Sequence, residues 1–229
     1  MRDLISVVSR GVRSFLFGEA SIYRNRKTGG WSQIGQDMFV SRALKDKPNG
    51  FYLEVGGFHP FQYSNSYYLE CRLGYKGVSF EKDSERQKAF QGKRDNECYS
   101  ANVLELNVDD FLRERSAPTQ IDYLSIDIEP NSATLEALKL FVSSSYRFTL
   151  ITFEHNKERP KGRDRQTWSD ALEFLSDKGY KRVCSDVKLN GFSSEDWYVD
   201  TSMLGTGELD ETYLQDIESG SGNEYFAIV

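Results

Sequence analysis

Short apolar segments alternate with amphipathic segments along most of the chain. Seven of the apolar segments have the length and composition of buried strands: residues 51–55, 77–80, 97–101, 123–128, 149–153, 182–187 and 196–199. Apolar positions at helical spacing precede or separate these strands over residues 33–44, 66–73, 108–115, 132–141 and 167–178. This alternation predicts an α/β fold with a mostly parallel, doubly wound sheet, in which the last two strands run antiparallel to each other.

The two ends of the chain differ from this middle part. Near the N-terminus, one helical stripe is formed by Leu4, Val8, Val12 and Phe15. We expect this helix to pack on the domain or to form a homo-oligomer; a membrane-surface helix is the alternative. Residues 200–229 hold seven acids and no Lys or Arg. We therefore divide the chain into an N-terminal helix and loop (1–31), a central domain (32–200) and an acidic C-terminal extension (201–229).

Composition and charge exclude several classes of protein. Hydrophobic residues make up 38% and charged residues 28% of the 229 positions, which is typical of a soluble globular protein. No apolar run approaches the roughly 20 residues that span a bilayer. The net charge of −6 argues against general nucleic-acid binding. The three cysteines are far apart, which disfavours a disulfide framework or a structural zinc site and predicts a cytoplasmic protein.

A glycine turn follows the first predicted strand. That strand carries Glu54 and runs into Gly56 and Gly57, and glycines at such a strand end let a ligand approach the backbone. Glu81 ends the second strand, where a carboxylate can accept hydrogen bonds from both hydroxyls of a ribose. The chain lacks GxGxxG, so a dinucleotide site is disfavoured. The glycine turn and Glu81 together favour a nucleoside ligand with a cationic amino group. The alternatives are an ordinary turn at Gly56 and Gly57 and a solvated charge at Glu81.

Further acids follow the central strands. Asp127 and Glu129 end the fourth strand, and Glu154 and His155 end the fifth. Such acids could orient an amino group, act as a base or hold a divalent ion. We expect His155 to face the crevice as a general base near neutral pH, with a structural histidine as the equal alternative; the other histidine, His59, is a weaker candidate.

A basic loop over residues 156–165 directly follows the fifth strand. It carries five cations against two acids. It is either a solvated mobile loop or a lid that attracts an acidic substrate, such as a phosphorylated or uronate-bearing glycan. The motifs of P-loop enzymes, zinc proteases and serine hydrolases are missing from the chain.

Several of these segments, taken together, resemble the FkbM family of S-adenosylmethionine-dependent methyltransferases. The segments are SQIGQDMFV (32–40), FYLEVGGFHPFQYSNSYYLECRLGYKGVSFEKDSER (51–86), IDYLSIDIEPNSATLEALK (121–139), ITFEHN (151–156) and SEDWYV (194–199). Their order and spacing cover about residues 32–199. The chain departs from the family pattern at Glu54, where the family more often has Asp, and at Pro130, where it usually has Gly.

The resemblance implies a Rossmann-like class I methyltransferase fold: a mostly parallel seven-stranded sheet with a late antiparallel strand and helices on both faces. It implies an S-adenosylmethionine site formed by Gln36, Asp37, Glu54, Gly56, Gly57, Ser64, Asn65, Glu81, Lys82, Asn102, Val103 and Asp127. In that site Glu54 would face the methionine part, Glu81 would bind the ribose, and Asp127 would lie close to the sulfonium.

The resemblance also implies O-methylation of a hydroxyl on a sugar, glycan or related small molecule, and the negative net charge argues against a nucleic-acid partner. Two catalytic arrangements stay open. His155 could be the base, oriented by Asp127 or Glu154, or a magnesium or calcium ion could be held by Asp127, Glu129 and Glu154. A nucleotide-binding oxidoreductase and a non-catalytic interaction module with a decayed pocket are the alternative functions.

Overall fold

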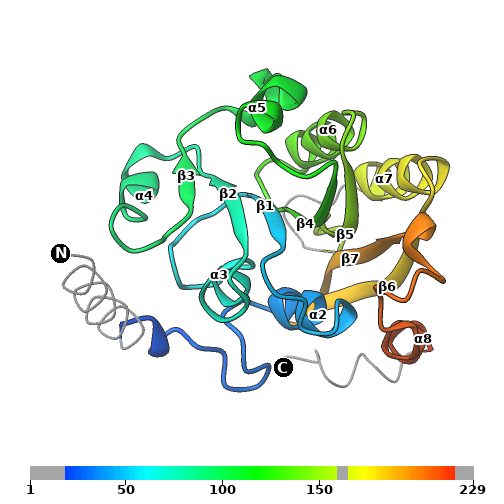
Figure 1. The fold of residues 1–229 in the computed structure, drawn as a ribbon. Coiled ribbons are helices and arrows are strands. Elements are labelled where there is room, and N and C mark those ends of the chain that lie inside the picture. The colour runs from blue at the N-terminus through cyan, green and yellow to red at the C-terminus, as the bar shows by residue number, and fades with distance from the viewer. Residues whose placement is uncertain (1–18, 159–164, 220–229) are drawn as a thin grey trace.

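The computed structural model describes residues 19–158 and 165–219. The predicted N-terminal stripe, the centre of the basic loop and the chain after residue 219 lie outside them. One seven-stranded sheet forms the centre (Figure 1), with strand order β3-β2-β1-β4-β5-β7-β6. The strands are β1 (Phe51–Val55), β2 (Lys76–Phe80), β3 (Glu97–Tyr99), β4 (Gln120–Ile126), β5 (Arg147–Glu154), β6 (Tyr180–Leu189) and β7 (Phe192–Asp200).

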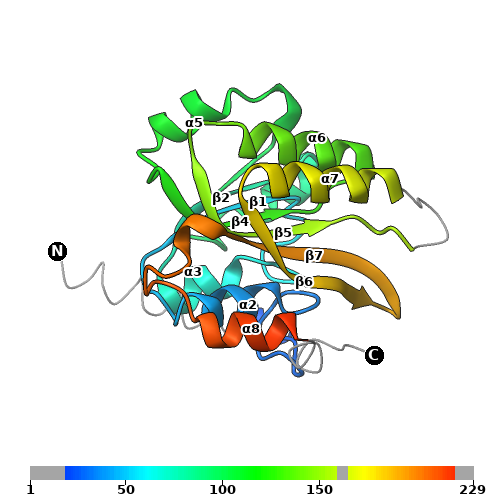
Figure 2. The same ribbon diagram turned by 90° about the vertical axis from the view of Figure 1, so that its right-hand side faces the viewer.

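Helices cover both faces of this sheet, as Figure 2 shows. One layer holds α5 (Val108–Glu114), α6 (Asn131–Val142) and α7 (Arg165–Asp177), and the other holds α2 (Gln36–Ala43), α3 (Tyr67–Leu73) and α8 (Glu211–Glu218). Shorter helical segments are α4 (Ser84–Lys88), η1 (Val103–Glu105) and η2 (Thr201–Met203). Two hydrophobic clusters fill the spaces between the sheet and the layers. No described helix is both long and apolar enough to cross a bilayer.

The predicted fold is confirmed. Strands β1 to β5 run parallel, and β7 is inserted antiparallel between β5 and β6. The strand order reverses beside β1, which pairs with β2 on one side and with β4 on the other. A crevice outside the carboxyl ends of the strands forms at such a switch point, and ligands of open α/β sheets bind there.

Helix α8 lies in the segment that we predicted to be an acidic extension. Its Leu214 and Ile217 are buried in the same cluster as Phe39 of α2, so this helix packs on the sheet and on α2. Residues three apart share one face of a helix, which explains how an acid-rich segment still presents an apolar side. The division of the chain into three parts stays a prediction.

Candidate cofactor and active site

A cavity of about 750 Å³ opens at the carboxyl ends of β1, β2, β4 and β5. This volume lies within the roughly 300–1,000 Å³ typical of small-molecule sites. Ten of the predicted site residues line the cavity: Gln36, Gly56, Asn65, Glu81, Lys82, Asn102, Val103, Asp127, Glu129 and Glu154. Five others do not line it: Asp37, Glu54, Gly57, Ser64 and His155. The fold therefore brings most of the predicted set together around one space.

Gly56 forms the floor where the two central strands end. Its φ of 101° is in the region that favours glycine. A β-carbon at this position would lie 1.7 Å from the backbone oxygen of Asp127. The amide of Gly56 donates to Phe80 O at 2.9 Å, and the amide of Asp127 donates to Val55 O at 2.9 Å. The turn is thus tied to both neighbouring strands, and the missing side chain lets the ends of β1 and β4 lie against each other.

Glu81 is buried at the end of β2 and lines the cavity. One carboxylate oxygen accepts from the amide of Phe58 at 2.9 Å, and the other accepts from the amide of Asp83 at 2.8 Å. These two amides fix the orientation of the carboxylate. Each oxygen has a further lone pair, so the group can also accept hydrogen bonds from a ligand's paired hydroxyls.

Glu54 does not line the cavity, and its contact with the methionine part of a ligand stays a prediction. Its carboxylate accepts from the amide of Asn65 at 2.8 Å and from the hydroxyls of Ser66 and Ser79, both at 2.7 Å. The sheet register places Glu54 directly beside Ser79 of β2, which explains this pairing. Glu54 therefore fixes the loop after β1 against β2.

Asn65 is one of the residues of this loop that line the cavity. Its side-chain amide donates to Ser125 Oγ at 2.9 Å. Its Oδ1 is buried and has no hydrogen-bond partner. A buried carbonyl oxygen without a donor is costly, so this atom is a candidate acceptor for a ligand's amino group. Neighbouring Ser64 faces the Glu54 carboxylate at 3.4 Å instead.

Asp37 is also structural. It is fully buried and accepts from the amide of Trp31 at 2.6 Å, and from the amide and hydroxyl of Ser32. Burial raises the pKa of Asp37, although these hydrogen bonds act in the opposite direction. The contacts fix the start of α2, so that Gln36 points into the cavity.

A group of acids forms the wall at the ends of β4, β5 and β7. Asp127 and Glu154 both line the cavity; the side chain of Asp127 is exposed after β4, and Glu154 is half-buried at the end of β5. Glu195 of β7 is paired in register with Glu154 and accepts from Gln36 Nε2 at 2.7 Å. Burial and Glu154 raise the pKa of Glu195 to about 8. We did not predict Glu195 as a site residue, although an acid within an apolar strand could have indicated one.

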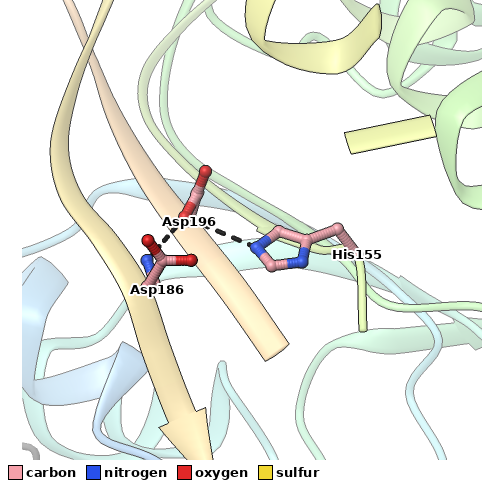
Figure 3. Close-up of side chains that lie close together, drawn as sticks. All are labelled: His155, Asp186 and Asp196. Atoms are coloured by element: carbon pink, nitrogen blue, oxygen red, sulfur yellow. Dashed lines mark hydrogen bonds and ion pairs between the residues drawn. The ribbon is translucent and has the colours of Figure 1, made fainter. Parts of the chain in front are cut away.

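His155 turns away from the cavity, against our prediction. Its ring is fully buried, and its Nε2 lies 3.4 Å from Asp196 Oδ1 (Figure 3). Its Nδ1 accepts from the amide of Lys157 at 3.2 Å. Nδ1 is thus used as an acceptor, and the buried Nε2 lies beside Asp196 without a hydrogen-bond partner among the described residues. His155 is therefore positioned to support the chain after β5. It is not placed to take a substrate proton.

Figure 3 shows the one close group of three metal-type donors found within the described ranges, His155, Asp186 and Asp196. Two cations already balance its carboxylates: Lys157 pairs with Asp186, and Arg182 pairs with Asp196 at 2.9 Å. Because both carboxylates are already paired with cations, these contacts form an ion-pair cluster rather than a metal site. The predicted metal set of Asp127, Glu129 and Glu154 is not assembled, so the structure lends the magnesium or calcium ion no support.

The sequence matches one family model, described as "Methyltransferase FkbM domain", over residues 57–182, which is more than half of the chain. A comparison with curated proteins finds no match.

Solved structures of methyltransferases share the fold. A putative rRNA-methylase from Clostridium thermocellum is 10% identical, with a TM-score of 0.53 over 73% of this chain and 95% of that one. An O-methyltransferase from Bacillus cereus in complex with SAH is 14% identical, with a TM-score of 0.50 over 83% and 90%. A putative O-methyltransferase from Klebsiella pneumoniae is 14% identical, with a TM-score of 0.50 over 72% and 79%. Identities this low indicate a common fold only.

Proposed function

The chain belongs to the FkbM methyltransferase domain family, and from this premise we propose that it transfers the methyl group of S-adenosylmethionine to a hydroxyl of a sugar, glycan or related small molecule. The observation that carries the proposal is the shared cavity of Gly56 and Glu81 at the strand-order switch point. The glycine turn at Gly56 and the fixed carboxylate of Glu81, on neighbouring strands, suit a ligand that is a nucleoside with an amino acid tail.

Two features of the cavity fit that cofactor. The unpartnered Asn65 Oδ1 can accept from the α-amino group, and the backbone of Gly56 lines the cavity with no side chain of its own. Glu81 would hold the ribose hydroxyls. The adenine would lie among Lys82, Asn102 and Val103, all of which line the same wall.

When bound, the cofactor supplies a methyl group on a sulfonium, so that a C–O bond forms, the C–S bond breaks with its electron pair left on sulfur, and the acceptor hydroxyl loses a proton. The protein's task is to align the acceptor and to take that proton. Asp127 and Glu154 are the acids that line the cavity nearest the switch point, and we assign them this role. His155 has no part in it, because its ring faces Asp196.

The acceptor class rests on charge. A net charge of −6 disfavours a polyanionic acceptor, although one protein of similar fold is titled a putative rRNA-methylase. Lys82 and Arg86 on the cavity wall suit an acceptor with a single acidic group. We also propose a cytoplasmic location, because the three cysteines are free.

The first test is binding. S-adenosylhomocysteine should raise the melting temperature of the protein in a saturable manner, whereas NADH should not. A response to NADH alone would point to the oxidoreductase, and no response to either would point to an interaction module. Transfer of radiolabelled methyl groups to glycan and RNA pools then separates the two acceptor classes, and label in RNA alone would overturn the glycan assignment.

A further inference from the structure

Two aromatic side chains are exposed at the rim of the cavity. Phe58 and Tyr63 both line the cavity, and their side chains are 41% and 49% exposed. Their rings stack on each other, with centroids 6.3 Å apart and planes inclined by 24°. Large apolar side chains that adjoin each other in the open beside a cavity mark a binding surface. We call Phe58 and Tyr63 the aromatic pair.

The backbone holds the aromatic pair in a conformation that bulky residues rarely adopt. Phe58 has a φ of 49° and Tyr63 has a φ of 59°, and both values lie in the left-handed region. Such conformations are costly for residues with a side chain, and they cluster at binding and catalytic sites. Two of them at the ends of one short loop point to a binding role for the two rings.

The loop between the two rings is fixed at several points. Phe61 is fully buried in a hydrophobic cluster of its own. The Nδ1 atom of His59 accepts from the amides of Phe61 and Gln62, at 3.1 and 2.9 Å. The Nη1 atom of Arg94 donates to Pro60 O at 2.9 Å. The aromatic pair is therefore pre-organised, and a ligand that packs on it needs little further ordering of the loop.

Arg86 of α4 adds a positive charge beside the aromatic pair. Its Cζ atom lies 4.7 Å from the centroid of the Phe58 ring, and its exposed side chain also lines the cavity. The amide of Phe58 donates to Glu81 at 2.9 Å, so the pair lies next to the carboxylate that we assign to the ribose. None of the contacts that we propose for the cofactor uses the two rings or Arg86. These groups are thus available to the acceptor.

This inference rests on the proposed function. We infer that the aromatic pair is the acceptor platform, on which the C–H face of a sugar ring packs while Arg86 binds an acidic group of the same glycan. The C–H groups on the face of a sugar are slightly positive, so they suit the negative face of an aromatic ring. The hydroxyls at the edge of the sugar then face the cavity, where Gln33 can hydrogen-bond to them.

A nucleobase is the other flat ligand that stacks on exposed aromatic rings. The charges around the cavity argue against it, because acids outnumber cations among the described residues that line this space. A phosphate backbone requires several cations along its path, whereas one acidic group of a glycan requires only Arg86. The platform therefore suits a sugar with a single acidic group better than a segment of RNA.

Two leucine variants separate the acceptor platform from the cofactor site. Phe58→Leu and Tyr63→Leu keep an apolar side chain but remove the flat ring. S-adenosylhomocysteine, titrated by calorimetry, should bind each variant within about threefold of its affinity for the wild type. A larger loss would place that ring in the cofactor site and overturn the inference. No binding to the wild type would overturn the proposed function instead.

Transfer of radiolabelled methyl groups to a glycan pool, at rising pool concentrations, measures the platform itself. The double variant Phe58→Leu with Tyr63→Leu should raise the apparent KM at least about tenfold with kcat little changed, because the rings bind the acceptor equally before and during transfer. Tyr63→Phe keeps the ring and should raise KM less than Tyr63→Leu. Phe192→Leu is the matched control, since Phe192 is also 41% exposed but does not line the cavity.

The outcomes separate the inference from the function on which it rests. An unchanged KM in the double variant, or an equal rise in Phe192→Leu, would overturn the inference, while labelling of glycans by the wild type would uphold the proposed function. Label that enters RNA alone would overturn the glycan assignment in both. Should the double variant fail to fold, the two single variants, whose folding the calorimetry has checked, decide.

Arg86→Gln tests the acidic group of the acceptor. The glycan pool is divided by anion exchange into acidic and neutral fractions. The variant should raise KM for the acidic fraction at least about fivefold more than KM for the neutral fraction, since only the acidic glycans lose an ion pair. Lys88→Gln, which removes another exposed cation of α4 that does not line the cavity, is the control and should leave both values unchanged. Equal effects of Arg86→Gln on the two fractions would overturn the role of Arg86.

Discussion

Gly56 lies against the backbone oxygen of Asp127, so that the turn after β1 and the end of β4 meet with no side chain between them. A β-carbon on Gly56 would be 1.7 Å from that oxygen. This contact joins the floor of the cavity to the acid that we assign to the reaction centre. Any group added at Gly56 would push the two strand ends apart.

Gly56→Ala should destabilise the protein and abolish binding of S-adenosylhomocysteine. Gly92→Ala is the matched control, because Gly92 also has a positive φ, 71°, but a β-carbon there meets nothing within 4 Å. The control should cost about 1 kcal/mol of unfolding free energy, and Gly56→Ala at least about 2 kcal/mol more. Urea denaturation measures both, and equal losses would refute the close contact.

Glu81→Ala should weaken binding of S-adenosylhomocysteine by about 1.5–3 kcal/mol, since it removes a charged acceptor for the ribose hydroxyls. Calorimetry measures the loss, with Glu85→Ala on exposed α4 as the control. The 2′-deoxy form of the ligand sharpens the test, because its affinity should drop less in the variant than that of the normal ligand. If both ligands lose the same affinity, Glu81 acts through the amides of Phe58 and Asp83 instead.

Glu54→Gln distinguishes a structural role from a binding role. The carboxylate satisfies four donors in the loop and in β2, so its loss should lower the unfolding free energy by about 2–3 kcal/mol. Ser79→Ala removes one of these donors and should cost about 1 kcal/mol. Weaker binding of S-adenosylhomocysteine at full stability would instead mean that Glu54 touches the ligand.

Stability should fall in acid through Asp196. Burial acts to raise the pKa of this carboxyl, but His155, the amide of Asp186 and Arg182 outweigh burial and hold the pKa below its ordinary value. Folding therefore favours the carboxylate. Its contribution is fully present above the unfolded pKa of about 4 and is lost as the pH falls below that toward the folded pKa.

Urea unfolding between pH 2.5 and 7 measures this contribution. Asp196→Asn should be less stable than the wild type at pH 7, and the difference should shrink as the pH falls. Asp177→Asn, which changes an exposed acid at the end of α7, should run parallel to the wild type. A difference between wild type and Asp196→Asn that does not vary with pH would exclude the ion-pair role.

Most strands and helices follow from local pattern. The β1 and β4 segments are apolar because helices cover both faces of the sheet, and such segments stand out in the sequence. Helix α4 escaped prediction because it has five residues and none is buried. Helix α8 was not predicted because acids surround its two buried side chains, Leu214 and Ile217.

The location of residues around the cavity could be predicted from the sequence, whereas the orientation of their side chains could not. Glu81 lies at the end of a parallel strand, and every such end faces the same edge of the sheet. Glu54 lies one position inside its strand, and its direction depends on Ser79 and on the loop after β1. His155 directly follows β5, as Glu81 directly follows β2, but its ring lies against Asp196 of β7.

The order of strands and helices, and the acids that end the strands, could be read from the chain because hydrophobic periodicity and residue type are local properties. The orientation of each acidic side chain and its protonation could not be read from the chain. Those properties arise when burial removes water and when Gln36, Glu195 and Asp196 arrive from distant segments. Charge interactions act through space between groups that the fold brings together, so their outcome depends on the packed structure.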